Sequence, residues 1–123
     1  MRHLASSYLP WLLLTYAIEI PLLVYLLRPS ARWPRSVVTG IACSGLTHPL
    51  LWFVWPRVVP LAHYALFLAT GEGLVVLVEA ALIWGIALRQ EERAARTAML
   101  ASIATNAASC AVGLVLQTAA GSA

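Results

Sequence analysis

The sequence predicts an all-α fold, a transmembrane bundle of four helices that run up, down, up and down. The 123 residues are 61% hydrophobic and only 11% charged, whereas a soluble domain carries about 25% charged residues. Four apolar segments lie between clusters of arginine, and a helix of roughly 20 apolar residues crosses the core of a bilayer. We therefore expect residues 1–123 to form a single integral membrane domain.

The four expected spans follow the chain in order, with approximate bounds. Residues 8–27 form the first span, which contains Glu19, and residues 36–55 form the second, which has no formal charge. The third covers residues 63–88, after two prolines, and the fourth covers residues 97–119. The connections are short, so helices that are neighbours in sequence should be antiparallel neighbours in space. We expect the first span to be a membrane helix rather than a signal peptide, because it contains a carboxyl group and lacks a small-residue cleavage site.

Arginine is distributed unevenly between the two ends of this bundle. Six of the eight arginines fall in the first and third connections: Arg28, Arg32, Arg35, Arg89, Arg93 and Arg96. Only Arg2 and Arg57 belong to the other end. Short cytoplasmic loops carry an excess of positive charge, so both termini should lie on the non-cytoplasmic side, in a bacterial inner (plasma) membrane. Tryptophans should then mark the interfaces, with Trp11, Trp52 and Trp55 near the outer one and Trp33 and Trp84 near the inner one.

Composition excludes several classes of function. The chain has no lysine, so neither a Schiff base nor a P-loop can form. The net charge of +3 is too small and too scattered for a nucleic-acid-binding patch. The expected partners are therefore the lipid bilayer and other membrane proteins, either further copies of this chain or a larger complex. Cys43 and Cys110 should be free thiols inside their spans.

Three of the five glutamates lie inside the predicted spans, where charge is expensive. A charged group at the bilayer centre costs about 2.5–3.5 kcal/mol on insertion scales, and Glu19, Glu72 and Glu79 are all placed there. Glu72 and Glu79 are seven residues apart, so they share one helix face and are separated by about 10 Å. No arginine lies within a span to neutralise them. These carboxyl groups must therefore be protonated, solvated by water or bound to a cation.

Other polar residues should lie with the acidic groups at successive depths in the interior of the bundle. At 1.5 Å per residue, His48 and Glu72 should lie about 10–12 Å from the outer end, Glu19 about 16 Å, and Asn106 and Glu79 about 20 Å. We expect Glu19, His48, Glu72, Glu79 and Asn106 to form a proton- or cation-binding site. The leading hypothesis is a small membrane protein that acts in transport or as a transport subunit, with no residue assigned a catalytic role.

Two further interpretations stay open. The buried carboxyl groups could instead act as packing contacts between helices, in a non-catalytic accessory or assembly subunit. Alternatively, His48, Glu19 and Glu72 could bind a metal cation in a metal-dependent enzyme that acts on lipid. No cofactor is otherwise expected. An enzyme is the less favoured interpretation, because the sequence has no His-Glu-x-x-His pattern and four short helices leave little room for a substrate pocket.

Four segments carry a resemblance to a known group of proteins. They are Glu19-Ile-Pro21, Leu46-Thr-His-Pro-Leu-Leu-Trp52, Glu72-Gly-Leu-Val-Val-Leu-Val-Glu-Ala80 and Asn106-Ala-Ala-Ser109. In these segments the chain resembles small four-helix bacterial inner-membrane proteins. The resemblance implies a four-helix membrane fold over nearly the whole chain, and it implies no activity and no catalytic residues.

Overall fold

The structure is a computed structural model that describes residues 2–121, with side chains described from Tyr8 onward. This part of the chain is helical apart from short turns and contains no β-strand. Four helices are long and apolar enough to cross a membrane: residues 8–26, 33–58, 61–87 and 94–121. The prediction of an all-α protein with four helices that are long and apolar enough to span a membrane is therefore confirmed for the described residues.

The helices are slightly longer than predicted, and two of them change their winding. Helix α1 covers Arg2–Leu26 and helix α5 covers Ala94–Gly121. Helix α2, Trp33–Pro49, continues through a π-helical segment, Leu50–Val54, into the short helix α3, Trp55–Val58. A 3₁₀ turn, Leu61–His63, then leads into helix α4, Tyr64–Leu82, which ends in a second π-helical segment, Ile83–Ala87.

Proline explains why α2 begins earlier than expected. Pro34 occupies the first turn of the helix, where its missing N–H is not needed and its fixed φ favours the helical conformation. Helix α1 passes through Pro10 and Pro21 without a break in its assigned helix. The first span is therefore continuous at Pro21, beside Glu19, where the sequence would allow a kink.

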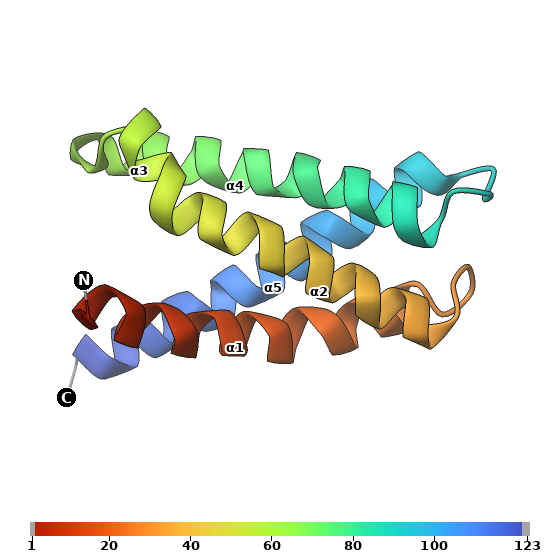
Figure 1. Cartoon of the computed structure of the whole chain (residues 1–123), viewed down its shortest axis with the longest axis horizontal. Coiled ribbons are helices and arrows are strands. Elements are labelled where there is room, and N and C mark those ends of the chain that lie inside the picture. The colour runs from red at the N-terminus through yellow and green to blue at the C-terminus, as the bar shows by residue number, and fades with distance from the viewer. Residues whose placement is uncertain (1, 122–123) are drawn as a thin grey trace.

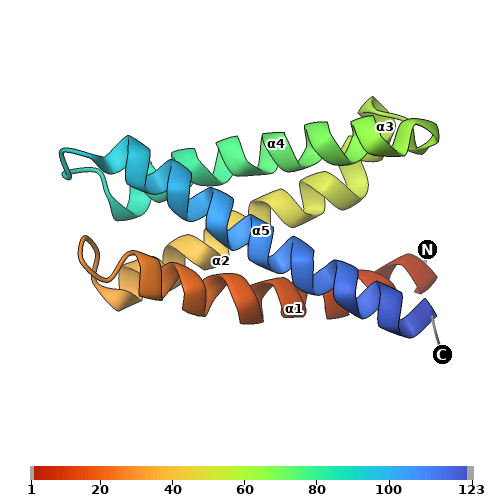
Figure 2. The ribbon, with the colours of Figure 1, turned by 180° about the vertical axis from the view of Figure 1, so that it is seen from behind.

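The four long helices form a crossed arrangement rather than a square of parallel rods. Helices α1 and α4 lie on opposite sides of the molecule, and α2 and α5 run diagonally between them on opposite faces (Figures 1 and 2). Successive long helices run in opposite directions, so both ends of the described chain lie at the same end of the bundle (Figure 1). The turn that contains Pro60 is also at this end, which we call the terminal end.

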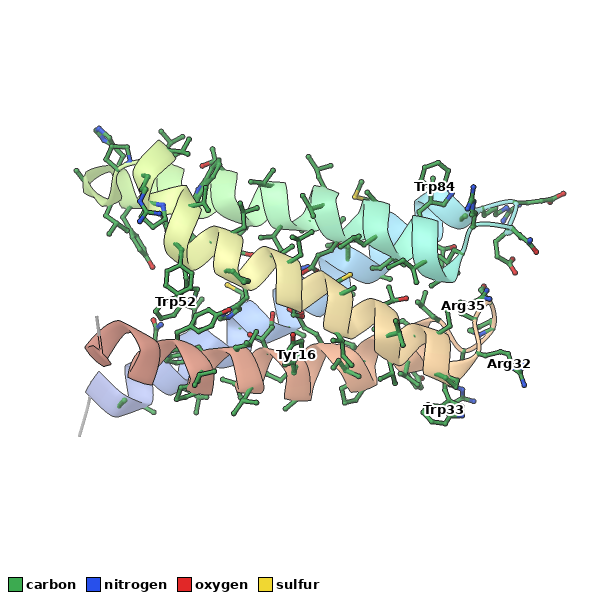
Figure 3. The ribbon with its side chains drawn as sticks, viewed as in Figure 1. Tyr16, Arg32, Trp33, Arg35, Trp52 and Trp84 are labelled. Carbon is green, nitrogen blue, oxygen red and sulfur yellow. The ribbon has the colours of Figure 1, made fainter. Side chains whose placement is uncertain are left out.

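The opposite end, which we call the arginine end, holds the apolar core. Its buried residues come from α1, α2, α5, the second π-helical segment and the positions that directly follow α1 and that segment: Leu23, Leu27, Cys43, Ile83, Ala87, Leu88, Ala94, Ala98 and Ala101. Figure 3 shows Arg32, Trp33, Arg35 and Trp84 at this end, whereas Trp52 lies toward the terminal end. The aliphatic and alanine side chains pack closely here, so this half of the bundle is closed.

Close contacts fix α2 against α1. A Cβ atom added to Gly40 would lie 2.9 Å from Cγ1 of Ile20, so the two helices approach closely there because residue 40 has no side chain. One turn further along, the hydroxyl group of Tyr16 donates to the backbone carbonyl of Ile41 at 3.3 Å (Figure 3). Small residues at such crossings are typical of helix pairs in lipid.

Candidate functional site

Glu19 is the only carboxyl group that α1 contributes to the interior of the bundle. Its side chain is 4% exposed, and both of its carboxyl oxygens accept hydrogen bonds. Ser44 of α2 donates to Oε2 at 2.6 Å, and Ser109 of α5 donates to Oε1 at 2.7 Å. Glu19 therefore links three helices through neutral donors.

Glu79 of α4 has a parallel set of contacts. It is 2% exposed, and its Oε1 accepts a hydrogen bond from the hydroxyl group of Thr47 at 2.7 Å. Its Oε2 accepts a hydrogen bond from the Asn106 amide at 2.6 Å. The same amide also donates to the backbone carbonyl of Ser102 at 2.9 Å, which fixes its orientation. As the sequence predicted, Asn106 and Glu79 lie at the same depth.

Glu19 and Glu79 thus have the same pattern of hydrogen bonds. Each comes from an outer helix, α1 or α4, and each accepts one hydrogen bond from α2 and one from α5. The two pairs of donors occupy neighbouring turns on each diagonal helix, at Ser44 and Thr47 and at Asn106 and Ser109. These four hydrogen bonds tie together all four long helices near the middle of the bundle.

A cavity of about 700 Å³ extends from these carboxyl groups toward the terminal end. Glu19, Glu72 and Glu79 all line it, together with residues as far away as Pro56 in α3 and Leu61 in the 3₁₀ turn at the terminal end. Among the described side chains, no arginine lines the cavity. The carboxyl groups therefore meet a hollow in which no fixed cation balances a negative charge.

Glu72 differs from the other two glutamates. It is half-buried, and it accepts no hydrogen bond from the part of the chain that the structure describes. Gly71, which precedes it, packs against the first π-helical segment and α3, because a Cβ atom there would lie 3.0 Å from both Leu51 and Trp55. Glu72 is therefore the carboxyl group with free hydrogen-bonding capacity inside the cavity.

His48 packs among aromatic rings at the side of this cavity. Its ring centroid lies 5.3 Å from that of Tyr8 and 6.1 Å from that of Trp52. Tyr8 also contacts Trp52 and Phe53, at centroid distances of 5.6 and 5.1 Å. Nδ1 of His48 is buried and has no hydrogen-bond partner among the described residues, so ring contacts rather than hydrogen bonds hold the imidazole.

The sequence suggested a metal shell of His48, Glu19 and Glu72, which the structure does not assemble. The described residues contain no group of three or more His, Cys, Asp or Glu side chains that could hold a metal ion. The physical reason is that the Glu19 carboxyl is already occupied by Ser44 and Ser109, while the imidazole of His48 lies among aromatic rings.

The backbone is irregular beside two of the site residues. The π-helical segment Leu50–Val54 follows His48 and Pro49, and the segment Ile83–Ala87 begins four residues after Glu79. Single π-helical turns are often found at functional sites. Pro49 gave a sequence signal for the first segment, whereas nothing in the sequence indicated the second.

Some residues of the site were not expected to belong to it. Thr47 is the direct partner of Glu79, and its signal was its position three residues after Ser44, on the same helix face. Trp11 and Trp52 were expected at the membrane interface, and the sequence did not indicate that they also line the cavity. The Nε1 group of Trp55 donates to the carbonyl of Phe67 at 3.1 Å, which fixes α3 against α4.

No protein-family model, curated protein or solved structure matches this chain. The resemblance to small four-helix bacterial inner-membrane proteins therefore stays a prediction, and the function is inferred from the site alone.

Proposed function

We propose that this protein binds a proton or another cation in the acidic cavity and acts in transport, alone or as a transport subunit. The observation that carries the proposal is the cavity of about 700 Å³ lined by Glu19, Glu72 and Glu79 and by no described arginine. A carboxyl group within a membrane segment is costly and commonly marks an ion pathway or proton relay. Here Glu72 is the primary binding group, because its carboxyl group accepts no hydrogen bond from the described residues.

The cavity lies in one half of the bundle, which favours a transport role. It extends from the middle of the bundle to the terminal end, while apolar side chains fill the arginine end. Transport sites commonly lie near the bilayer midplane, beside irregular helices, with access from one side at a time. The π-helical segments at Leu50–Val54 and Ile83–Ala87 supply such irregularity on two helices.

A second candidate function is that of an accessory or assembly subunit, and one observation favours it. All four carboxyl oxygens of Glu19 and Glu79 are satisfied within the bundle. Hydrogen bonds of this kind between membrane helices contribute on average about 0.6 kcal/mol each. In that case Glu19 and Glu79 act in packing alone, and Glu72 contacts a partner helix.

We further propose that the arginine end faces the cytoplasm of a bacterial inner membrane, so that the cavity lies in the outer half of the bundle. Exposed arginines at this end, among them Arg32, Arg35 and Arg93, support this orientation through the positive-inside rule. Cysteine substitutions at Val58 and Glu92, each in a chain without Cys43 and Cys110, test it. An impermeant maleimide should label position 58 in intact cells and position 92 only after permeabilisation, and the opposite pattern would reverse the orientation.

The transport proposal is tested by flux into proteoliposomes of defined lipid composition. Wild-type protein should carry protons or Na⁺ down an imposed gradient, read by a pH-sensitive or Na⁺-sensitive dye inside the vesicles. Glu72→Gln should lower this flux by about tenfold or more, because an interaction with a charged group is worth about 1.5–3 kcal/mol. Glu91→Gln is the matched control, since Glu91 is an exposed loop residue, and it should leave the flux unchanged.

The outcomes separate the two candidate functions. Wild-type flux above that of empty vesicles, lost in Glu72→Gln and kept in Glu91→Gln, supports transport. No flux from wild-type protein, together with loss of a co-purifying membrane protein in Glu72→Gln, overturns transport in favour of the accessory function.

A further inference from the structure

We propose that the ligand of the cavity is an organic monocation that carries an aromatic group. This inference rests on the proposed cation-binding function and names the chemical class of the cation. It is drawn from the size of the cavity, the aromatic side chains in its wall and the position of its free carboxyl group.

The size of the cavity exceeds what a proton or a bare metal ion needs. Its volume is about 700 Å³, and pockets that bind organic molecules have volumes of about 300–1,000 Å³. An inorganic cation would also need several ligands converging on one point, and the described His, Cys and acidic residues form no such cluster. The cavity therefore fits an organic ligand that has an uncharged part as well as a charged group.

The wall of the cavity is rich in aromatic rings. Trp11, Trp52, Tyr64 and Phe67 line it, and they come from α1, the first π-helical segment and α4. Aromatic faces attract cations, and quaternary ammonium groups are commonly recognised by several rings at once. The same rings also provide apolar surface for a flat ligand.

The three carboxyl groups of the cavity differ in how available they are to a cationic ligand. Glu19 and Glu79 already accept two hydrogen bonds each, whereas Glu72 lines the same cavity and has no hydrogen-bond partner in the described part of the chain. A single cationic group beside Glu72 would have one counter-charge and an aromatic wall. A dication would need a second free carboxylate, which the described residues of the cavity do not provide.

The test uses isothermal titration calorimetry to measure the binding of four small ions to purified wild-type protein in an uncharged detergent. Benzyltrimethylammonium carries the charge and the ring, tetramethylammonium the charge alone, benzoate the ring with the opposite charge, and Na⁺ a bare charge. Benzyltrimethylammonium should bind saturably and at least tenfold more tightly than tetramethylammonium. Benzoate should not bind.

Two pairs of variants assign the binding to this cavity. Glu72→Gln should weaken benzyltrimethylammonium binding by about tenfold, since the salt bridge to the ligand is lost, while Glu91→Gln leaves it unchanged. Trp52→Leu should also weaken it, whereas Trp84→Leu should not, because Trp84 is 52% exposed and lies at the arginine end (Figure 3). If Trp52→Leu does not fold, Phe67→Leu removes another ring from the same wall.

Failure of this inference can be told from failure of the proposed function. Glu72-dependent flux of protons or Na⁺ without benzyltrimethylammonium binding would overturn the aromatic cation and leave the transport function standing. The absence of both flux and binding would overturn both. Binding of benzoate as tight as that of benzyltrimethylammonium would show an apolar site without charge selection and would also overturn the inference.

Discussion

Glu72 differs from the other two intramembrane glutamates in what its carboxyl group contacts. Glu19 and Glu79 each accept two hydrogen bonds from neutral groups, while Glu72 accepts none from the described residues. Buried polar groups are normally satisfied, so a half-buried carboxyl group beside a hollow has capacity for an external partner. At the scale of single residues, this separates two glutamates that also hold the helices together from one that is available to a ligand.

Thr47→Val tests whether the Glu79 hydrogen bonds stabilise the bundle. The substitution keeps the shape of the side chain and removes the donor to Oε1 of Glu79, so the free energy of unfolding should fall by about 1 kcal/mol. Thr39→Val is the control, because Thr39 is equally buried on the same helix and donates only to the carbonyl of Arg35, four residues earlier. Unfolding in mixed detergent micelles measures both, and equal losses would count against a stabilising contact with Glu79.

The sequence predicts the acidic residues of the site better than their partners. Carboxyl groups in a membrane span are conspicuous because their cost is high, and the depth count brought Glu79 and Asn106 to one level. Thr47 is less conspicuous, because a threonine in a helix commonly bonds to a carbonyl of its own helix, as Thr47 also does to Cys43 at 2.9 Å. Its second bond, to Glu79, depends on how α2 and α4 are rotated, which a single sequence does not reveal.

At the scale of helices, the crossing of α1 and α2 depends on Gly40. Ile20 occupies the space where a side chain at residue 40 would lie. The existence of these helices follows from their apolar length alone. Their rotation and crossing angle follow from such contacts, which is why the spans are predicted well and the cavity is not.

Gly40→Ala should therefore destabilise the protein. The added Cβ atom would meet Cγ1 of Ile20 at 2.9 Å, and overpacking of this kind costs about 1–3 kcal/mol. Gly73→Ala is the matched control, because a Cβ atom on Gly73 has no neighbour within 4 Å, and its stability should be unchanged or slightly higher. The double variant Gly40→Ala with Ile20→Ala should recover much of the loss, and no recovery would place the strain elsewhere.

At the scale of the whole molecule, the crossed helices produce two unlike halves. Aliphatic side chains and alanines fill the arginine end, and the cavity occupies the other half, with the buried carboxyl groups at the level between them. Trp11 and Trp52, which the sequence places near the terminal-end interface, also line the cavity. A tryptophan near the end of a helix suits either position, so the sequence alone does not show that these two line a cavity.

The most direct test of cation binding in the cavity is the rate at which dicyclohexylcarbodiimide, a hydrophobic carboxyl reagent, labels each glutamate of the wild-type protein, read by peptide mass spectrometry. Glu72 should be labelled before Glu19 and Glu79, which are only 4% and 2% exposed. At least one of the two cations, benzyltrimethylammonium or Na⁺, should slow the labelling of Glu72. Tetramethylammonium added at equal ionic strength controls for electrostatic screening by salt. Labelling of Glu19 or Glu79 ahead of Glu72, or a Glu72 rate that neither cation changes, would contradict a cation site in the cavity.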